Sequence, residues 1–206
     1  MSGILATTRI DHAEQVARVV LAELPERWRH TQGVAGRAAE LAAALGEDPE
    51  VLVVAAWLHD IGYGEAARDT GFHPLDGARY LDRQRWPARI SALVAHHSAA
   101  CFVAEARGLA DALSWYRREE SPLADALTYA DQTVGPAGRR TSVQQRMAEM
   151  LHRHGPQSPN AAAHRLRGPY LLSLADRVEQ RLAQPVAWRR SPPTGPAAVL
   201  SALPAH

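Results

Sequence analysis

His59 and Asp60 directly follow a strongly apolar segment, VLVVAAWL, and stand just before Gly62, a residue typical of a helix end. A helix that is apolar on all sides belongs in the middle of a fold, where an unpartnered carboxylate is very costly. A divalent cation would be a suitable partner. The alternative is a capping histidine beside a surface aspartate, although a carboxylate at a helix C-terminus opposes the helix dipole.

His30 and Asp131 show a similar anomaly on two other predicted helices. Asp131 lies four residues after Leu127 and shares the apolar stripe of its helix, and His30 lies one helical step before Val34. Both positions therefore face the predicted core. Each also has a purely structural interpretation. Asp131 could leave the stripe at a fraying helix end, and His30 could be a hydrogen-bonded core histidine.

Three more histidines fall between the His-Asp pair and Asp131. His73 precedes Pro74 and is expected to project from a loop at a helix N-terminus. His96 and His97 end another apolar stripe, and periodicity does not separate them, although the stripe extends most directly to His97. Imidazole together with carboxylate suits Mn, Fe, Co, Ni or Zn rather than Mg alone.

These side chains must be positioned by helices, because the apolar residues recur at helical spacing and no convincing strand is present. Asp48 and Pro49 are typical of a helix start, and Gly46 of a helix end. The fold class predicted is an all-α bundle with irregular connections. Its predicted helices cover residues 11–24, 30–46, 49–60, 74–83, 87–97, 103–118, 122–131, 141–154 and 159–182.

The pattern resembles the HD-domain metal-dependent phosphohydrolases. The motif HDIG stands at residues 59–62, and FHPLDGARYL and VAHHS resemble the segments that carry the two additional histidines of members with two metals. The resemblance runs from about residue 27 to residue 133. It implies an HD-domain helical bundle with one or two divalent ions between the helices.

The resemblance also implies a ligand set. The first metal would be held by His30, His59, Asp60 and Asp131. Asp60 would bridge to a second metal held by His73 and His96, with His97 as the replacement for His96 or as a proton-transfer group. Asp60 and His97 are accordingly the expected catalytic residues.

The implied reaction is attack of a metal-activated water on a phosphate ester. Arg37 lies seven residues after His30, on nearly the same helix face, and is the candidate that binds the substrate phosphate. A surface arginine with a buried stem is the alternative. Arg27, Arg139 and Arg140 are weaker candidates.

The function implied is hydrolysis of a nucleotide or other small phosphate ester by a phosphohydrolase or phosphodiesterase. Two alternatives stay open: a diiron oxygenase of the same superfamily, and a non-catalytic nucleotide-binding sensor. Tyr63, and the segment SAACFV after the paired histidines, depart from the family members that hydrolyse cyclic dinucleotides.

Composition restricts the function further. The chain has 206 residues, a net charge of +1, no lysine and one cysteine, Cys101. This excludes lysine chemistry, an intrachain disulfide and a thiolate zinc site, and argues against large nucleic-acid partners. No apolar run is long enough to span a membrane, and no targeting signal is recognised, so the expected location is the cytoplasm. Oligomeric state is left undetermined.

Residues 1–184 are predicted to form one domain, with its motif core at about 27–133 and C-terminal helices at 141–183. The proline-rich end, residues 185–206, is predicted to be a disordered tail.

Overall fold

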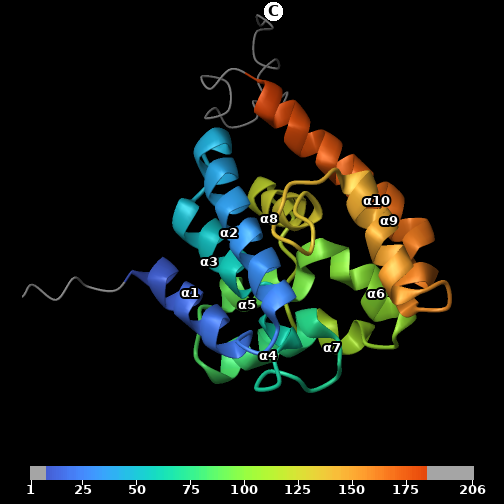
Figure 1. The fold of residues 1–206 in the computed structure, drawn as a ribbon, viewed down its shortest axis with the longest axis horizontal. Helices are drawn as coiled ribbons and strands as arrows, with labels where there is room; N and C mark the ends of the chain where they lie inside the picture. Colours follow the sequence, from blue (N-terminus) through green and yellow to red (C-terminus); the bar gives the residue numbers. More distant parts are fainter. Residues whose placement is uncertain (1–7, 185–206) are drawn as a thin grey trace, which may run out of the picture.

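A computed structural model describes residues 8–184, which fold into helices joined by short irregular segments (Figure 1). Within this range the only strand-like pairing is an isolated bridge between Val134 and Arg140. The all-α prediction is therefore confirmed. The α-helices are α1 (Arg9–Val20), α2 (Pro25–Leu45), α3 (Pro49–Leu58), α4 (His73–Arg83), α5 (Ala88–His96), α6 (Ala100–Ala106), α7 (Ala110–Ser114), α8 (Pro122–Gln132), α9 (Val143–His154) and α10 (Pro159–Ala183). Two short 3₁₀ turns, η1 (Ile61–Tyr63) and η2 (His97–Ala99), follow α3 and α5.

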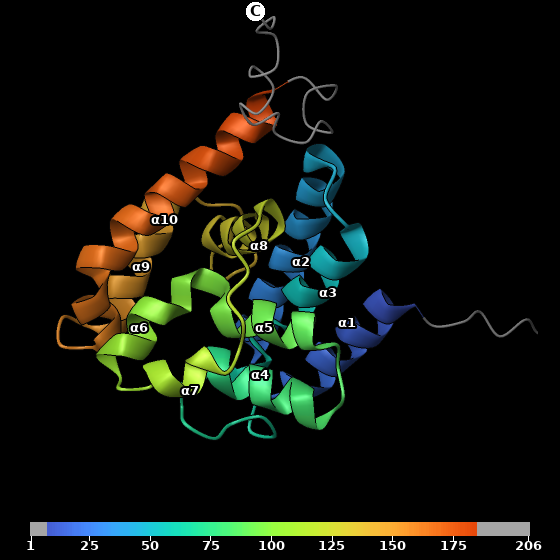
Figure 2. The ribbon, with the colours of Figure 1, turned by 180° about the vertical axis from the view of Figure 1, so that it is seen from behind.

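Helix α3 lies inside the bundle, as its apolar sequence predicts. It packs against α1, α2, α5 and α8, and its last residue, Leu58, is fully buried. Figures 1 and 2 show α8 between α2 and α10 from both sides. The ends of α2, α3, α5 and α8 are thereby close enough to place their polar residues around one point in the core.

Local capping explains several helix ends. The side chain of Asp48 accepts hydrogen bonds from the backbone N–H groups of Glu50 and Val51, at 3.0 and 3.2 Å. Gly46 ends α2 in the left-handed conformation, with φ of 70°. Ser121 caps α8 by accepting a hydrogen bond from the N–H of Ala124. These caps are the ones expected from the sequence.

Several predicted boundaries are wrong in detail, and the first helix ends at Val20 rather than at residue 24. Helix α2 begins at Pro25 rather than at His30, because proline fits the first helical position. The helix predicted over residues 103–118 is two helices, since Gly108 breaks it with φ of 67°. The helix predicted over residues 141–154 begins at Val143, and Ser142 caps it in a capping box with Gln145.

The C-terminal helices share one core with the rest of the bundle. Leu171, Leu174 and Val178 of α10 and Met147 of α9 belong to the same buried cluster as Leu41 of α2. Helix α10 also packs along α6 and α8. Among the described residues, no helix combines the length and the apolarity that crossing a membrane requires. The predicted tail, residues 185–206, lies outside the described residues.

Candidate metal centre

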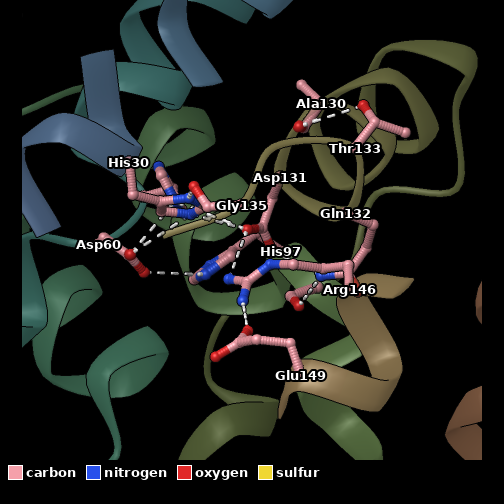
Figure 3. Close-up of polar contacts among 12 residues, drawn as sticks. His30, Asp60, His97, Ala130, Asp131, Gln132, Thr133, Gly135, Arg146 and Glu149 are labelled. Atoms are coloured by element: carbon pink, nitrogen blue, oxygen red, sulfur yellow. Dashed lines mark hydrogen bonds and ion pairs between the residues drawn. The ribbon is translucent and has the colours of Figure 1, made fainter. Parts of the chain in front are cut away.

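His30 and Asp131 are brought together in the core. His30, in the second turn of α2, is 1% exposed, and its Nε2 lies 3.0 Å from Oδ1 of Asp131 near the end of α8. The other ring nitrogen, Nδ1, lies 3.2 Å from the carbonyl oxygen of Gly135. Figure 3 shows the side chains of His30 and Arg146 pointing toward Asp131 from two sides. Asp131 is therefore a buried carboxylate rather than a frayed helix end.

His59 lies at the C-terminal end of α3 and is fully buried. Its Nδ1 lies 2.7 Å from the carbonyl oxygen of Ala56. Its Nε2 is 3.5 Å from Oδ2 of Asp60 and 4.0 Å from Oδ1 of Asp131, yet has no hydrogen-bond partner. A buried nitrogen that faces two carboxylates without a bond is best explained by a cation between them.

Asp60 stands between two groups of histidines and directs a different oxygen to each. Oδ2 is 3.8 Å from Nε2 of His30 and 3.5 Å from Nε2 of His59. Oδ1 is 3.3 Å from Nε2 of His73 and 3.9 Å from Nε2 of His97. His30, His59 and Asp60 form one group that could hold an ion, and Asp60, His73 and His97 form another. A carboxylate placed in this way could be shared by two metal ions.

Backbone hydrogen bonds orient these imidazoles. In His30, His59 and His97 the Nδ1–H donates to a backbone carbonyl oxygen, and the carbonyl nearest His97 is that of Val94, at 2.6 Å. When the proton of such a ring is on Nδ1, its Nε2 presents a lone pair, and in all three rings Nε2 lies 3.0–3.9 Å from a carboxylate oxygen. Two acceptors facing each other repel, whereas a cation between them is coordinated by both. The donor set therefore fits a divalent metal.

The electrostatics of the centre keep its ligands in their metal-binding forms. Burial raises the pKa of Asp60, but interactions with the surrounding imidazoles and with the charge of Arg27 outweigh burial and hold that pKa well below its usual value. Burial also lowers the pKa of His73 well below its usual value, against the raising effect of Asp60. Burial likewise lowers the pKa of His97. Ionised carboxylates and neutral imidazoles are the ligand forms that metals bind.

The structure selects His97 over His96, which corrects the expected ligand set. His96 ends α5, and its Nε2–H donates to the carbonyl oxygen of Tyr116 at 2.8 Å, on another side of the helix. His97 continues the stripe of Ile90 and Val94 into the core and is 2% exposed. Adjacent side chains at a helix end point about 100° apart, so the two rings diverge. The backbone then leaves the helical conformation at His97, with ψ of 159°.

The turn that follows His97 is conformationally unusual. Ser98 and Ala99 both adopt the left-handed conformation, with φ of 58° and 53°. Ser98 is held by four contacts. Its Oγ accepts from Gln132 and Arg167, its carbonyl oxygen accepts from Arg167, and its N–H donates to Thr128. Helix α10 thus helps to fix the turn that presents His97.

Arg37 does not reach the centre, which corrects the expected phosphate ligand. Seven residues are about two turns along α2, so Arg37 is displaced from His30 by about 10 Å along the helix. It pairs instead with Glu40 at 3.0 Å and lies over the ring of Tyr129. Arg27, one turn before His30, is the arginine of α2 that contacts the centre, with its Nη1 3.0 Å from Oδ2 of Asp60.

The glycine of HDIG has a spatial role. A Cβ atom at Gly62 would lie 2.0 Å from the carbonyl oxygen of His73 and 2.6 Å from the N of Gly77. Only glycine therefore allows η1 to pack against the first turn of α4, which carries His73. Asp76, fully buried in that turn, accepts hydrogen bonds from the N–H and hydroxyl of Thr70 and the N–H of Gly71, and so fastens the preceding loop.

Sequence reasoning missed the arginines of the C-terminal helices. Arg146 and Arg153 of α9 and Arg167 of α10 line a cavity together with Asp60, His73 and Asp131. Arg146 and Arg167 are each only 6% exposed. The available signal was an arginine on the buried face of an amphipathic helix, but these helices lie beyond the recognised motifs.

The fold and the site together define an all-helical protein with two adjoining His/Asp groups that could hold divalent metal. The HD-domain family model matches residues 27–134, just over half of the chain, and the chain belongs to that family. No curated protein and no solved structure matches the chain. Members of the HD-domain family are in general metal-dependent phosphohydrolases.

Proposed function

We propose that this protein is a metal-dependent hydrolase of small phosphate esters, with a nucleotide among the expected substrates. The observation that carries the proposal is the shared carboxylate of Asp60. Its two oxygens face separate pairs of imidazole nitrogens at 3.3–3.9 Å. That arrangement suits two adjacent divalent ions, and paired ions of this kind are typical of phosphoryl hydrolysis.

The residues divide into two sets. His30, His59, Asp60 and Asp131 would hold one ion, and Asp60, His73 and His97 would hold the other. Bound divalent metal supplies a water of lowered pKa and positive charge for the phosphoryl oxygens. Arg27 lies at the edge of this arrangement and can also take up phosphoryl charge, since its guanidinium is only partly used by Asp60.

Tyr63 is a positioning residue in this proposal. Its ring stacks on His73 with centroids 4.1 Å apart, and the guanidinium of Arg27 lies over the same ring at 4.2 Å. The aromatic ring thereby separates a metal ligand from a cationic side chain and fixes both. Such stacking keeps the imidazole of His73 directed toward Asp60.

Hydrolysis is tested with protein loaded with Mn, Fe, Co, Ni or Zn and a panel of nucleotides, phosphomonoesters and phosphodiesters. Release of phosphate or nucleotide is expected, and it should be lost in a folded Asp60→Asn variant. If the protein hydrolysed no ester of the panel with any of these metals, the proposal would be overturned. Iron-dependent oxygen uptake with a substrate would assign the diiron oxygenase chemistry instead, and nucleotide binding without turnover would assign a sensor.

A further inference from the structure

Helix α9 lies outside the family match and brings two arginines to the metal centre. Arg146 and Arg153, together with Arg27 of α2, line the cavity that also contains Asp60 and Asp131. Figure 3 shows Arg146 extending from its helix toward the cluster of His97 and Asp131. Three guanidinium groups from two distant parts of the chain therefore surround one opening.

The hydrogen-bonding capacity of these arginines is not used up. Arg146 is 6% exposed, its Nε has no hydrogen-bond partner, and its Nη2 lies 3.8 Å from Asp131. Glu149 is shared, because it accepts a hydrogen bond from Nη1 of Arg146 and forms an ion pair with Nε of Arg153 at 3.0 Å. A buried donor without an acceptor is costly, so the cavity is built for an acceptor that the protein does not provide.

The cavity also has an excess of positive charge once Asp60 and Asp131 are counted as metal ligands. Asp60 and Asp131 face the metal groups, which leaves Glu149 as the carboxylate nearest to Arg146 and Arg153. The crowding of positive charge is visible at Arg153, where burial and the charges of Arg27 and Arg146 lower the pKa of the guanidinium. A ligand with more than one negative charge would relieve this crowding.

The size of the cavity limits the ligand. The part beside Arg27 and Arg146 has a volume of about 50 Å³. A second cavity of about 100 Å³ adjoins it at His73 and Tyr63 and is lined in part by the apolar side chains of Phe72 and Val103. The first space suits a single tetrahedral anion, and the second suits a compact leaving group.

We propose that Arg146 and Arg153 of α9, with Arg27, form a binding site for a terminal phosphate group, and that the substrate is a dianionic phosphomonoester. A monoester phosphate offers three oxygens and two negative charges to three guanidinium groups, whereas a diester has a single charge and substituents on two sides. This inference rests on the proposed function and names its substrate class. Arg167 is excluded from the anion site, because its guanidinium is bonded to Ser98.

The test is the affinity of Mn-loaded protein for inorganic phosphate, measured by isothermal titration calorimetry, with metal content measured on the same samples. Arg146→Gln and Arg153→Gln should each weaken phosphate binding about tenfold and leave the metal content unchanged. Arg165→Gln is the matched control, since Arg165 is exposed on α10. Its phosphate affinity should equal that of the wild type.

Glu149→Gln should have the opposite effect on phosphate affinity. Removing this carboxylate frees Arg146 and Arg153, so phosphate should bind several-fold more tightly. A merely structural role of the two arginines would instead predict weaker or unchanged binding. Wild-type phosphate affinity in both arginine variants would overturn the proposed anion site, as would a loss of affinity accompanied by an equal loss of metal.

A pair of chromogenic esters tests the substrate class. The wild type should hydrolyse p-nitrophenyl phosphate at least tenfold more efficiently than bis(p-nitrophenyl) phosphate, and Arg153→Gln should reduce that preference. A preference for the diester would overturn the assignment to monoesters. Absence of all turnover with phosphate binding intact would instead contradict the proposed hydrolase, so the two failures are distinguishable.

Discussion

Gly62 packs directly against the backbone of His73, so closely that a Cβ on the glycine would lie 2.0 Å from the carbonyl oxygen of the histidine. The fourth residue of HDIG thus sets the position of a side chain eleven residues further along. Since Asp60 precedes this contact by two residues, one glycine couples the carboxylate of Asp60 to the first turn of α4.

The replacement Gly62→Ala should destabilise the protein by about 3 kcal/mol, because the new methyl group must displace backbone atoms. It should also reduce the amount of bound metal, since α4 must move away from Asp60. Urea unfolding and elemental analysis would measure the two effects.

Gly36→Ala is the control for that substitution. Gly36 is exposed within α2, and a Cβ atom added there would have no neighbouring atom within 4 Å. The variant should be more stable than the wild type by about 0.5–1 kcal/mol, from helix propensity alone. Equal stability of the two variants would contradict the packing role of Gly62.

The shared carboxylate predicts different metal stoichiometries for two variants. Asp60→Asn should lose both ions, because Asp60 belongs to both His/Asp groups. His73→Gln should lose only one of two, since His73 belongs to a single group. Metal content per chain after gel filtration would decide, with Asp111→Asn as the exposed control. Identical metal content in the Asp60 and His73 variants would refute a bridging role.

The two adjacent histidines should behave differently. His97→Gln should lower metal content and abolish turnover, because Nε2 of His97 faces Asp60. His96→Gln should retain metal, because it removes only the hydrogen bond to the carbonyl oxygen of Tyr116. Elemental analysis of both purified variants measures this difference. If the His96 variant lost metal and the His97 variant kept it, His96 rather than His97 would be the metal ligand.

Metal should stabilise the fold. An ion that binds only the folded chain, at about a hundred times its dissociation constant, raises the free energy of unfolding by about 2.7 kcal/mol. For a chain of this length the melting temperature should rise by roughly 5–10 °C. Calorimetry with and without a chelator would show the difference, and Asp60→Asn should lack it.

Variants of Arg27 and Arg37 test which arginine of α2 contributes to substrate turnover. Arg27→Gln should lower kcat/KM for the best ester of the panel by roughly 10–100-fold, because this guanidinium contacts Asp60 at the cavity. Arg37→Gln should stay within about twofold of the wild type, since Arg37 pairs with Glu40. Steady-state kinetics on both variants would measure the contrast.

Local chemistry made much of the fold predictable. The Asp48–Pro49 start, the Gly46 end and the apolar stripes of α2, α3 and α8 each depend on a few neighbouring residues, and the structure confirms them. A boundary failed where one residue type has two meanings, because proline can follow one helix or open the next. Here α1 ends already at Val20, and Pro25 opens α2.

The site was predictable to the extent that its residues violate local rules. Buried polar positions such as His30, Asp60 and Asp131 are conspicuous on apolar helix faces. The choice between His96 and His97 required the tertiary contacts of the two rings, with Tyr116 and with Asp60, which periodicity does not contain. Arg146 and Arg153 were missed because their nearness to Asp60 results from tertiary packing of α9, more than eighty residues away in the chain.

The hydrogen bonds that hold Ser98 limit how this protein can be divided into fragments. Arg167 supplies two of the contacts that hold the left-handed turn after His97, and Arg167 lies beyond the segment that defines the family. A fragment trimmed to residues 27–134 would keep every expected metal ligand. It would lose Arg167, which holds the turn next to His97. The structural unit that holds the candidate site is therefore larger than the family match, and the C-terminal helices belong to that unit.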